Sequence, residues 1–166
     1  MKKILFVLLA AAMLGTLLVG CAGQSGAAPT TSGPTLITVK GKIAAGQYLL
    51  DQAAFDKNAK DGPYFDPWVG KAGKDVTIKG IMLKDLITLV KPASDAKTVS
   101  MIATDGKAFD VSIADAQNFN IMLARWIDGV ALEEKTGGPV KLAYPKEATQ
   151  YTPEQWAWWV VSVEFK

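Results

Sequence analysis

Residue types that commonly carry catalysis or hold metal ions are scarce in this chain of 166 residues, which has one cysteine, Cys21, and no histidine. Without histidine, His-ligated haem, zinc or copper sites built on imidazole, and Ser-His or Cys-His nucleophiles are excluded. Carboxylates alone can still hold a metal ion, but no group of them has the spacing of a calcium loop. Candidate sites must therefore be built from carboxylates, lysines and aromatic rings.

The segment 64–71 contains the clearest candidate for a binding site. Pro67 holds Asp66 extended, and the neighbouring glycines permit sharp chain reversals. A carboxylate beside Tyr and Trp rings on an exposed loop is a typical contact for a ligand or a partner. Alternatively, Phe65 and Trp68 turn inward and close the end of a barrel, because aromatic side chains are usually buried. On the first interpretation, the ligand-binding residues here are Tyr64, Asp66, Trp68 and Lys71.

Two further candidates lie later in the chain. Arg125 is the only arginine, and a guanidinium binds phosphate or carboxylate through two parallel hydrogen bonds. The alternative is that Arg125 lies on a solvated strand face or pairs with a nearby acid. Trp156 and Trp158 fall on the strand face opposite Trp159, so one set can be core while the other lines a groove or a partner surface. We therefore add Arg125 and Trp156 to the candidate ligand-binding residues.

The N-terminal leader predicts export from the cytoplasm. Residues 1–3 are positively charged, and residues 4–19 are an apolar run, which is the layout of a secretory signal. Because Cys21 directly follows Gly20, the leader resembles a bacterial lipoprotein signal, in which cleavage before the cysteine is coupled to its lipidation. The alternatives are an ordinary cleaved signal with an incidental cysteine, or an uncleaved membrane helix of marginal length. The lipoprotein interpretation makes residues 1–20 a signal peptide.

Residues 21–34 follow as a flexible tether, because they are rich in Gly, Ser, Thr, Ala and Pro and carry no charge. Ala22 rather than Asp after the cysteine indicates, by the same resemblance, the outer membrane of a Gram-negative cell. Removing Lys2 and Lys3 takes the basic count from 18 to 16, against 16 acidic residues. The exported protein is formally neutral, which argues against nucleic acid as a partner. With Cys21 lipidated, no thiol remains for a disulfide.

Hydrophobic periodicity predicts the elements of one domain over residues 35–166. Residues 36–43 alternate as a half-buried strand, residues 47–59 favour a short helix, and residues 74–79 form a strand that ends at Gly80. A clearer helix covers residues 82–90. Its apolar residues recur at i, i+3, i+4 and i+7, at Leu83, Leu86, Ile87 and Val90.

Turn residues complete the predicted organisation. Turns are expected at residues 61–63 and 136–139, and Asp-Gly pairs predict hairpins at residues 105–106 and 128–129. A strand is expected at residues 140–144, and residues 152–155 favour a capped helical turn. In a final strand over residues 156–166, the inward residues are expected to be Trp159, Val161, Val163 and Phe165. Together these predict an α+β domain, predominantly β, with two or three short helices.

The order of several short motifs resembles the oxidoreductase molybdopterin-binding domain of the sulfite oxidase superfamily. The resemblance spans nearly all of residues 36–165 and rests on Asp66-Pro67-Trp68, Gly80-Ile81-Met82-Leu83-Lys84-Asp85-Leu86-Ile87, Thr104-Asp105-Gly106, Ile127-Asp128-Gly129-Val130-Ala131-Leu132, Gly137-Gly138-Pro139-Val140-Lys141-Leu142-Ala143-Tyr144-Pro145 and the Trp-rich final strand. It implies a largely β fold whose catalytic members hold a molybdenum cofactor. In those members a cysteine thiolate, in the loop between the first helix and the strand before the Gly-Ile-x-Leu helix, binds the molybdenum.

This sequence departs from that pattern, because the corresponding region carries Asp66-Pro67-Trp68 and no cysteine. A carboxylate does not simply replace a thiolate as a soft ligand, so we expect the fold without its catalysis and predict no bound cofactor. The favoured hypothesis is a membrane-tethered binding or accessory module in which Asp66 and Trp68 form one wall of a pocket, reached by Lys71 or Arg125. The alternative is a molybdopterin-dependent oxidoreductase or redox component that binds the cofactor without cysteine ligation.

The leader gives a first testable prediction, that Cys21 carries the membrane anchor. Cys21→Ser should release the protein from membranes or block its processing, because the lipidated thiol is removed. Membrane fractionation and labelling with a radioactive fatty acid measure this. Continued lipid labelling and membrane association of the variant would contradict the prediction.

Overall fold

The computed structural model describes residues 33–166, and its first strand is β1 (Thr35–Gly41). It lies inside a five-stranded sheet. The spatial order is β2 (Gln47–Asp51), β1, β10 (Val160–Phe165), β5 (Thr98–Ala103) and β6 (Ala108–Ser112). Strands β1 and β10 are parallel, whereas the other neighbours are antiparallel. The predicted signal peptide, Cys21 and most of the predicted tether lie outside the described residues.

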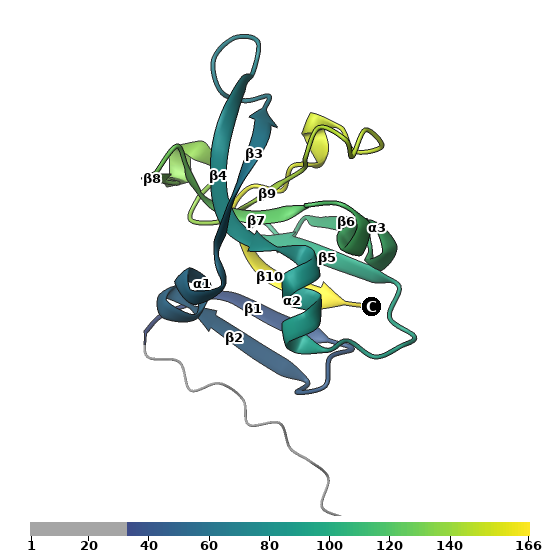
Figure 1. Ribbon diagram of the computed structural model, residues 1–166. Coiled ribbons are helices and arrows are strands. Elements are labelled where there is room, and N and C mark those ends of the chain that lie inside the picture. Colours follow the sequence, from purple (N-terminus) through teal and green to yellow (C-terminus); the bar gives the residue numbers. More distant parts are fainter. Residues whose placement is uncertain (1–32) are drawn as a thin grey trace, which may run out of the picture.

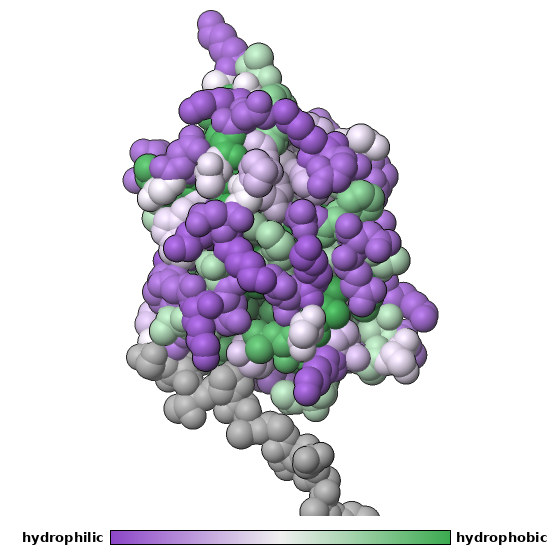
Figure 2. Space-filling model, viewed as in Figure 1, coloured by the Kyte–Doolittle hydropathy of each residue, from purple (hydrophilic) through white to green (hydrophobic). Residues whose placement is uncertain are grey.

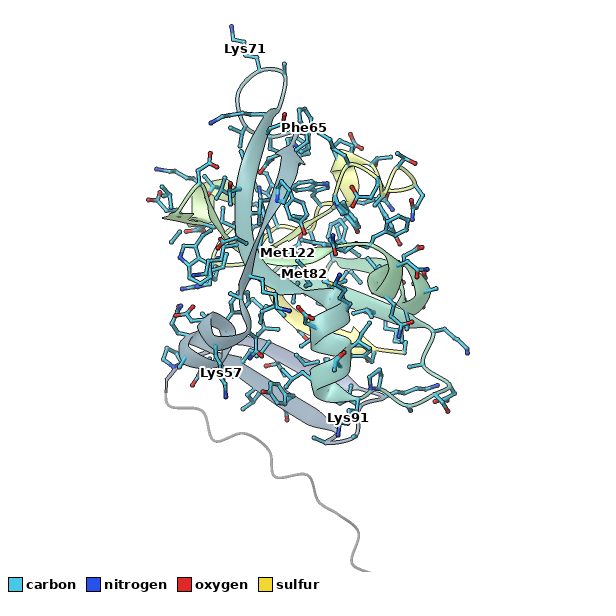
Figure 3. All side chains as sticks on the ribbon, in the orientation of Figure 1. Lys57, Phe65, Lys71, Met82, Lys91 and Met122 are labelled. Atoms are coloured by element: carbon cyan, nitrogen blue, oxygen red, sulfur yellow. The ribbon has the colours of Figure 1, made fainter. Side chains whose placement is uncertain are left out.

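A second sheet carries the long hairpin that rises at the top of Figure 1. Its spatial order is β3 (Lys60–Asp66), β4 (Lys74–Met82), β7 (Met122–Ile127) and β8 (Val130–Ala131), and β9 (Lys141–Ala143) also pairs with β7. Met82 and Met122 are register partners of β4 and β7 and lie together in Figure 3. One cluster of buried hydrophobic side chains includes residues of both sheets and of the helix after β4.

Three short α-helices and two 3₁₀ turns connect the strands of the part of the chain that the structure describes. The helices are α1 (Gln52–Asn58), α2 (Leu83–Val90) and α3 (Ile113–Asn118), and the turns are η1 (Glu134–Thr136) and η2 (Pro153–Gln155). Within residues 33–166, no helix is long and apolar enough to span a membrane. The face seen in Figure 1 is mainly hydrophilic, with hydrophobic residues in small separate areas (Figure 2). The predicted α+β class, dominated by strands, is confirmed.

Several predicted elements are confirmed with their faces. Ile37 and Val39 are buried in β1, and the predicted stripe of α2 is buried along its whole length. Both Asp-Gly pairs connect hairpin strands, β5 with β6 and β7 with β8. The capped turn at η2 also forms, since the side chains of Thr152 and Gln155 accept reciprocal backbone hydrogen bonds.

Two predictions at the start of the domain are wrong. Residues 47–59 are not one helix, because residues 47–51 pair with β1 and Asp51 caps the helix that follows by accepting a 2.8 Å hydrogen bond from the Ala54 amide. Residues 61–63 are not a turn but part of β3. This strand is at the edge of its sheet and pairs with β4 on one side. An edge strand tolerates Pro63, because no strand on its other side needs the backbone N–H that proline lacks.

Gly80 was expected to end a strand, but β4 continues through it to Met82. A Cβ atom at this position would lie 2.0 Å from the Leu123 carbonyl oxygen, so only glycine lets β7 approach this closely. The pairing of β4 with β7 shifts register at the same place, between Lys79 and Gly80. The glycine therefore serves sheet packing rather than strand termination.

The final strand is shorter than predicted and its inward residues are different. Val163 and Phe165 are buried as expected, but a register shift between Val160 and Ser162 against β5 interrupts the alternation before them. Trp159 and Val161 are exposed instead. A further helix, α3, which the sequence pattern did not predict, begins at Ile113, because Ser112 caps it by accepting a hydrogen bond from the Asp115 amide.

Helix α2 gives a stability prediction with a matched control on the same helix. Leu86 is 0% exposed, whereas Leu89 is 37% exposed. Leu86→Ala should lower the free energy of unfolding by about 2–5 kcal/mol, through lost burial and a residual cavity. Leu89→Ala should change it by less than about 1 kcal/mol. Urea denaturation measures both, and equal midpoints for the two variants would contradict the packing described here.

Candidate functional site

A buried ion pair joins the end of β3 to β9. The Lys141 Nζ atom donates a 2.6 Å hydrogen bond to Oδ2 of Asp66, and the two side chains are 2% and 0% exposed. Lysine and aspartate are almost never fully buried unless they are paired, because burial strips each charge of its hydration. This pair is the only ion pair of the described residues in which both side chains are buried.

Local chemistry fixes Asp66 at the end of β3. Pro67 restricts the residue before it to an extended conformation, and Asp66 pairs with Lys74 of β4 in that conformation. Its second carboxylate oxygen, Oδ1, accepts a 2.9 Å hydrogen bond from the Trp68 amide, which forms a side-chain turn. Both oxygens of Asp66 are therefore engaged by the protein itself.

Tertiary pairing brings Lys141 to Asp66. Strand β9 lies against β7, with Lys141 opposite Ala124. The segment 157–160 runs along the other side of β9, where the Leu142 amide donates to the Ala157 carbonyl at 2.7 Å and the Val160 amide donates to the Val140 carbonyl at 2.9 Å. These hydrogen bonds hold the tryptophan-rich segment against Lys141.

Tryptophan rings surround the ammonium group of Lys141. Its Nζ atom lies 5.3 Å from the ring centroid of Trp156 and 5.8 Å from that of Trp158, which are cation–π distances. Trp158 also contacts Trp68 edge to face, with 5.8 Å between ring centroids. The negative faces of the rings thus supplement Asp66 in stabilising a buried positive charge.

The turn η1 and the glycines after it complete this region. Gly137 has a φ of +89°, and a Cβ atom there would lie 2.8 Å from the Trp158 ring. Trp159, itself in the left-handed region with a φ of +54°, donates from its amide to the Gly137 carbonyl and from its indole Nε1 to the Glu134 carbonyl, both at 2.8 Å. Close approach at Gly137 and these two hydrogen bonds fix η1 beside the tryptophans.

A cavity of about 370 Å³ opens between these elements, and we call it the tryptophan pocket. This volume is within the range of sites that bind small organic molecules. Most of its lining is apolar or aromatic, and four charged side chains contribute to it. The lining residues are Asp66, Trp68, Val69, Ile127, Val130, Ala131, Leu132, Glu133, Lys135, Thr136, Lys141 and Trp158.

The structure brings together some of the candidate residues in the segment 64–71. Asp66 and Trp68 both line the tryptophan pocket, but Asp66 is buried rather than on an exposed loop, and Trp68 is 48% exposed rather than turned inward. Tyr64 lies outside the pocket lining and donates its hydroxyl hydrogen bond to the Asn120 carbonyl. Burial, and secondarily the charge of Glu147, raises the pKa of Tyr64 well above its usual range, so it stays neutral.

The remaining candidates occupy other places. Trp156 is buried behind the pocket against Lys141, and Lys71 extends from the tip of the β3–β4 loop away from the body of the molecule (Figure 3). Arg125 donates to the Gln52 side chain on α1, with its guanidinium 5.3 Å from the Trp126 ring. Burial lowers the pKa of Arg125, and the nearby charge of Asp56 opposes this shift. Neither Lys71 nor Arg125 lines the pocket.

Sequence reasoning missed Lys141 and Lys135 as pocket residues, and it left open whether Trp158 lies in the core or lines a groove. Lys141 interrupts an apolar run between Val140 and Leu142. This is the one local signal that its charged side chain is buried and needs a partner. Its partner Asp66 is 75 positions away, so only the sheet pairing identifies the contact. A lysine in the middle of a buried strand is a signal to search for a buried acid.

Comparison with known protein families agrees with the fold. The model for the oxidoreductase molybdopterin binding domain matches residues 56–166. The chain belongs to this family. The matched part of the molybdopterin binding domain extends from within α1 to the last strand, so it includes the second sheet and the tryptophan pocket but not β1 and β2 of the first sheet. The resemblance inferred from the sequence is confirmed.

A solved structure shares the fold at low sequence identity. The sulfane dehydrogenase SoxCD from Paracoccus pantotrophus superposes with a TM-score of 0.64 and 13% identity. The match covers 78% of this chain and 37% of the dehydrogenase chain, so the molybdopterin binding domain described here corresponds to little more than a third of that protein. Among curated proteins, none matches the chain in sequence.

The donor groups of this domain do not fit a thiolate-held molybdenum. Residues 33–166 contain neither cysteine nor histidine, and nowhere in that range do three acidic side chains cluster to hold a metal ion. Asp66, in the loop region where the family resemblance places the ligand, already accepts hydrogen bonds on both oxygens. A metal ion there would have to compete with the Lys141 ammonium for a hard oxygen ligand.

The buried pair gives a second stability prediction. Lys141→Met should lower the free energy of unfolding by roughly 3–5 kcal/mol, because it leaves the Asp66 carboxylate buried without a counter-charge. The double variant Asp66→Asn/Lys141→Met should lose less than the two single variants added together. Chemical denaturation of all three variants completes the double-mutant cycle.

A control for this cycle is Lys146→Met, whose ion pair with Asp75 is exposed and should contribute no more than about 1 kcal/mol. If Lys141→Met is no less stable than Lys146→Met, the two charges at Asp66 and Lys141 are not coupled as described.

Proposed function

We propose that this chain is a membrane-tethered extracytoplasmic binding or accessory module on a molybdopterin-domain scaffold, and that it acts without molybdenum catalysis. The observation that carries the proposal is the Asp66–Lys141 ion pair at the floor of the tryptophan pocket. A cavity with apolar walls and a few fixed polar groups is the usual form of a small-molecule site. The ligand is a small molecule or a segment of a partner protein.

The arrangement of the domain supports a tether at the end opposite the pocket. Figure 1 shows the start of β1 at the lower left and the tip of the β3–β4 hairpin at the top, at opposite ends of the molecule. A lipid on Cys21 would therefore attach near the β1 end, and the hairpin end would be free to meet ligands or partners. We accordingly place the protein in the bacterial cell envelope, lipid-anchored, on the outer membrane if the cell is Gram-negative.

Family membership supports a second candidate, a molybdopterin-dependent oxidoreductase or redox component that binds the cofactor without cysteine ligation. The two candidates differ in what the purified protein contains. The binding module carries no cofactor, whereas the oxidoreductase carries one molybdenum atom and one pterin per chain.

Metal analysis of the protein, produced in a host that makes the molybdenum cofactor, separates these candidates. We expect no stoichiometric molybdenum, no pterin absorption and no turnover of sulfite or sulfoxides, because the domain offers no thiolate ligand. The control is a molybdenum enzyme purified from the same culture. One molybdenum atom per chain would overturn the proposed function and establish the oxidoreductase candidate.

Thermal-shift screening with a chemically broad set of metabolites and short peptides tests ligand binding. A ligand at a hundred times its dissociation constant should stabilise the fold by about 2.7 kcal/mol. The gain should vanish in Trp68→Ala, which removes a pocket wall, and persist in Lys71→Ala, whose side chain lies outside the pocket lining. A gain retained in Trp68→Ala would place the ligand elsewhere.

A further inference from the structure

The charges that line the tryptophan pocket cancel in pairs. Lys141 neutralises Asp66 at the floor, with 2.6 Å between their charged atoms. Lys135 neutralises Glu133 at the rim, with 2.7 Å between theirs, and both rim side chains are largely exposed to solvent. An ionic ligand would lose hydration on entering and find no unpaired counter-charge, so the lining disfavours both anions and cations.

The Lys141 ammonium still has hydrogen-bonding capacity. An ammonium group has three N–H donors, and in the described residues Nζ donates one hydrogen bond, to Asp66. Its other neighbours are the Trp156 and Trp158 rings, which contact the charge but offer no oxygen or nitrogen acceptor. Because Lys141 lines the cavity, a ligand acceptor at the floor would complete a charge-assisted hydrogen bond.

The walls favour a flat ring. Trp68 is 48% exposed and meets Trp158 at an interplanar angle of 85°, so each ring supports the other in one orientation. The lining also has an aliphatic part, which includes Ile127, Val130 and Leu132. A planar ligand in this pocket would bury apolar surface and contact an aromatic ring with little loss of side-chain freedom.

We infer that the tryptophan pocket binds a neutral, planar ring compound whose carbonyl oxygen or ring nitrogen accepts a hydrogen bond from Lys141. This inference rests on the proposed function and specifies its ligand class. The paired charges disfavour ionic ligands, the remaining N–H groups of Lys141 favour a ligand with an acceptor, and the tryptophan rings favour a planar ring.

Four probes that share one benzene ring and differ in a single substituent test the inference. They are acetophenone (neutral, with a carbonyl acceptor), ethylbenzene (neutral, without an acceptor), benzoate (anionic) and benzylammonium (cationic). We expect acetophenone to bind about tenfold more tightly than ethylbenzene, because only its carbonyl accepts from Lys141. Both ions should bind at least about tenfold more weakly than acetophenone. Titration followed by tryptophan fluorescence and by calorimetry measures the dissociation constants.

Variants of the protein test whether Lys141 is the group that distinguishes acetophenone from ethylbenzene. In Asp66→Asn/Lys141→Met, which removes both floor charges together, acetophenone should lose its advantage over ethylbenzene. Lys71→Met, a matched lysine substitution outside the pocket, should leave all four constants unchanged. Trp68→Ala should weaken both neutral probes. If the double variant does not fold, the ranking of the four probes on the unmodified protein and the Trp68→Ala result still decide.

The outcomes separate this inference from the proposed function. Tightest binding of benzoate or benzylammonium, equal binding of the two neutral probes, or binding of none of the four would overturn the ligand class. In those cases a pocket-dependent thermal shift by another compound would leave the binding module standing. Stoichiometric molybdenum in the purified protein would instead overturn the proposed function, whatever the probe ranking.

Discussion

The surrounding structure depends on one constraint. Asp66 and Lys141 carry opposite charges that are removed from water and must stay paired. Each charge is stable in the interior only while the other stays within hydrogen-bond distance, so the end of β3 and the strand β9 must keep their positions. The Asp66 turn, the pairing of β9 with β7 and the hydrogen bonds from residues 157–160 all hold that geometry. The tryptophans lie beside Lys141 for the same reason, since their rings favour a cation.

Membership of the molybdopterin binding domain family fixes the scaffold, while the residues in the site determine the chemistry. In the region where catalytic relatives are expected to supply a thiolate, this chain supplies a carboxylate that its own lysine already binds. An internal ion pair thus stands where a metal ligand is expected. The cavity beside it has aromatic walls and lysine side chains in its lining, which are the basis of the proposed binding function.

Local sequence patterns predicted elements well where one face of an element is buried and its period is uninterrupted. The apolar stripe of α2 and the Asp-Gly hairpins are of this kind. Two of the errors fall where two strands pair out of simple register or approach unusually closely. The shift at Val160 exposes Trp159 and Val161, and the close contact of Gly80 with Leu123 lets β4 continue past a glycine. Such features depend on the partner strand, which the local pattern does not contain.

The sequence by itself determined the α+β class, the order of most elements and the family, because these follow from hydrophobic period, turn residues and motif order. It also determined that thiolate and imidazole chemistry are absent from residues 33–166. Only the tertiary structure decided which candidates share a site. Asp66 and Trp68 lie in one pocket, whereas Lys71 is at a loop tip and Arg125 binds Gln52 on α1. The partner of Lys141 could be found only in this way, because the pairing of β9 with β7, rather than any local preference, places its charge against Asp66, which is 75 positions away.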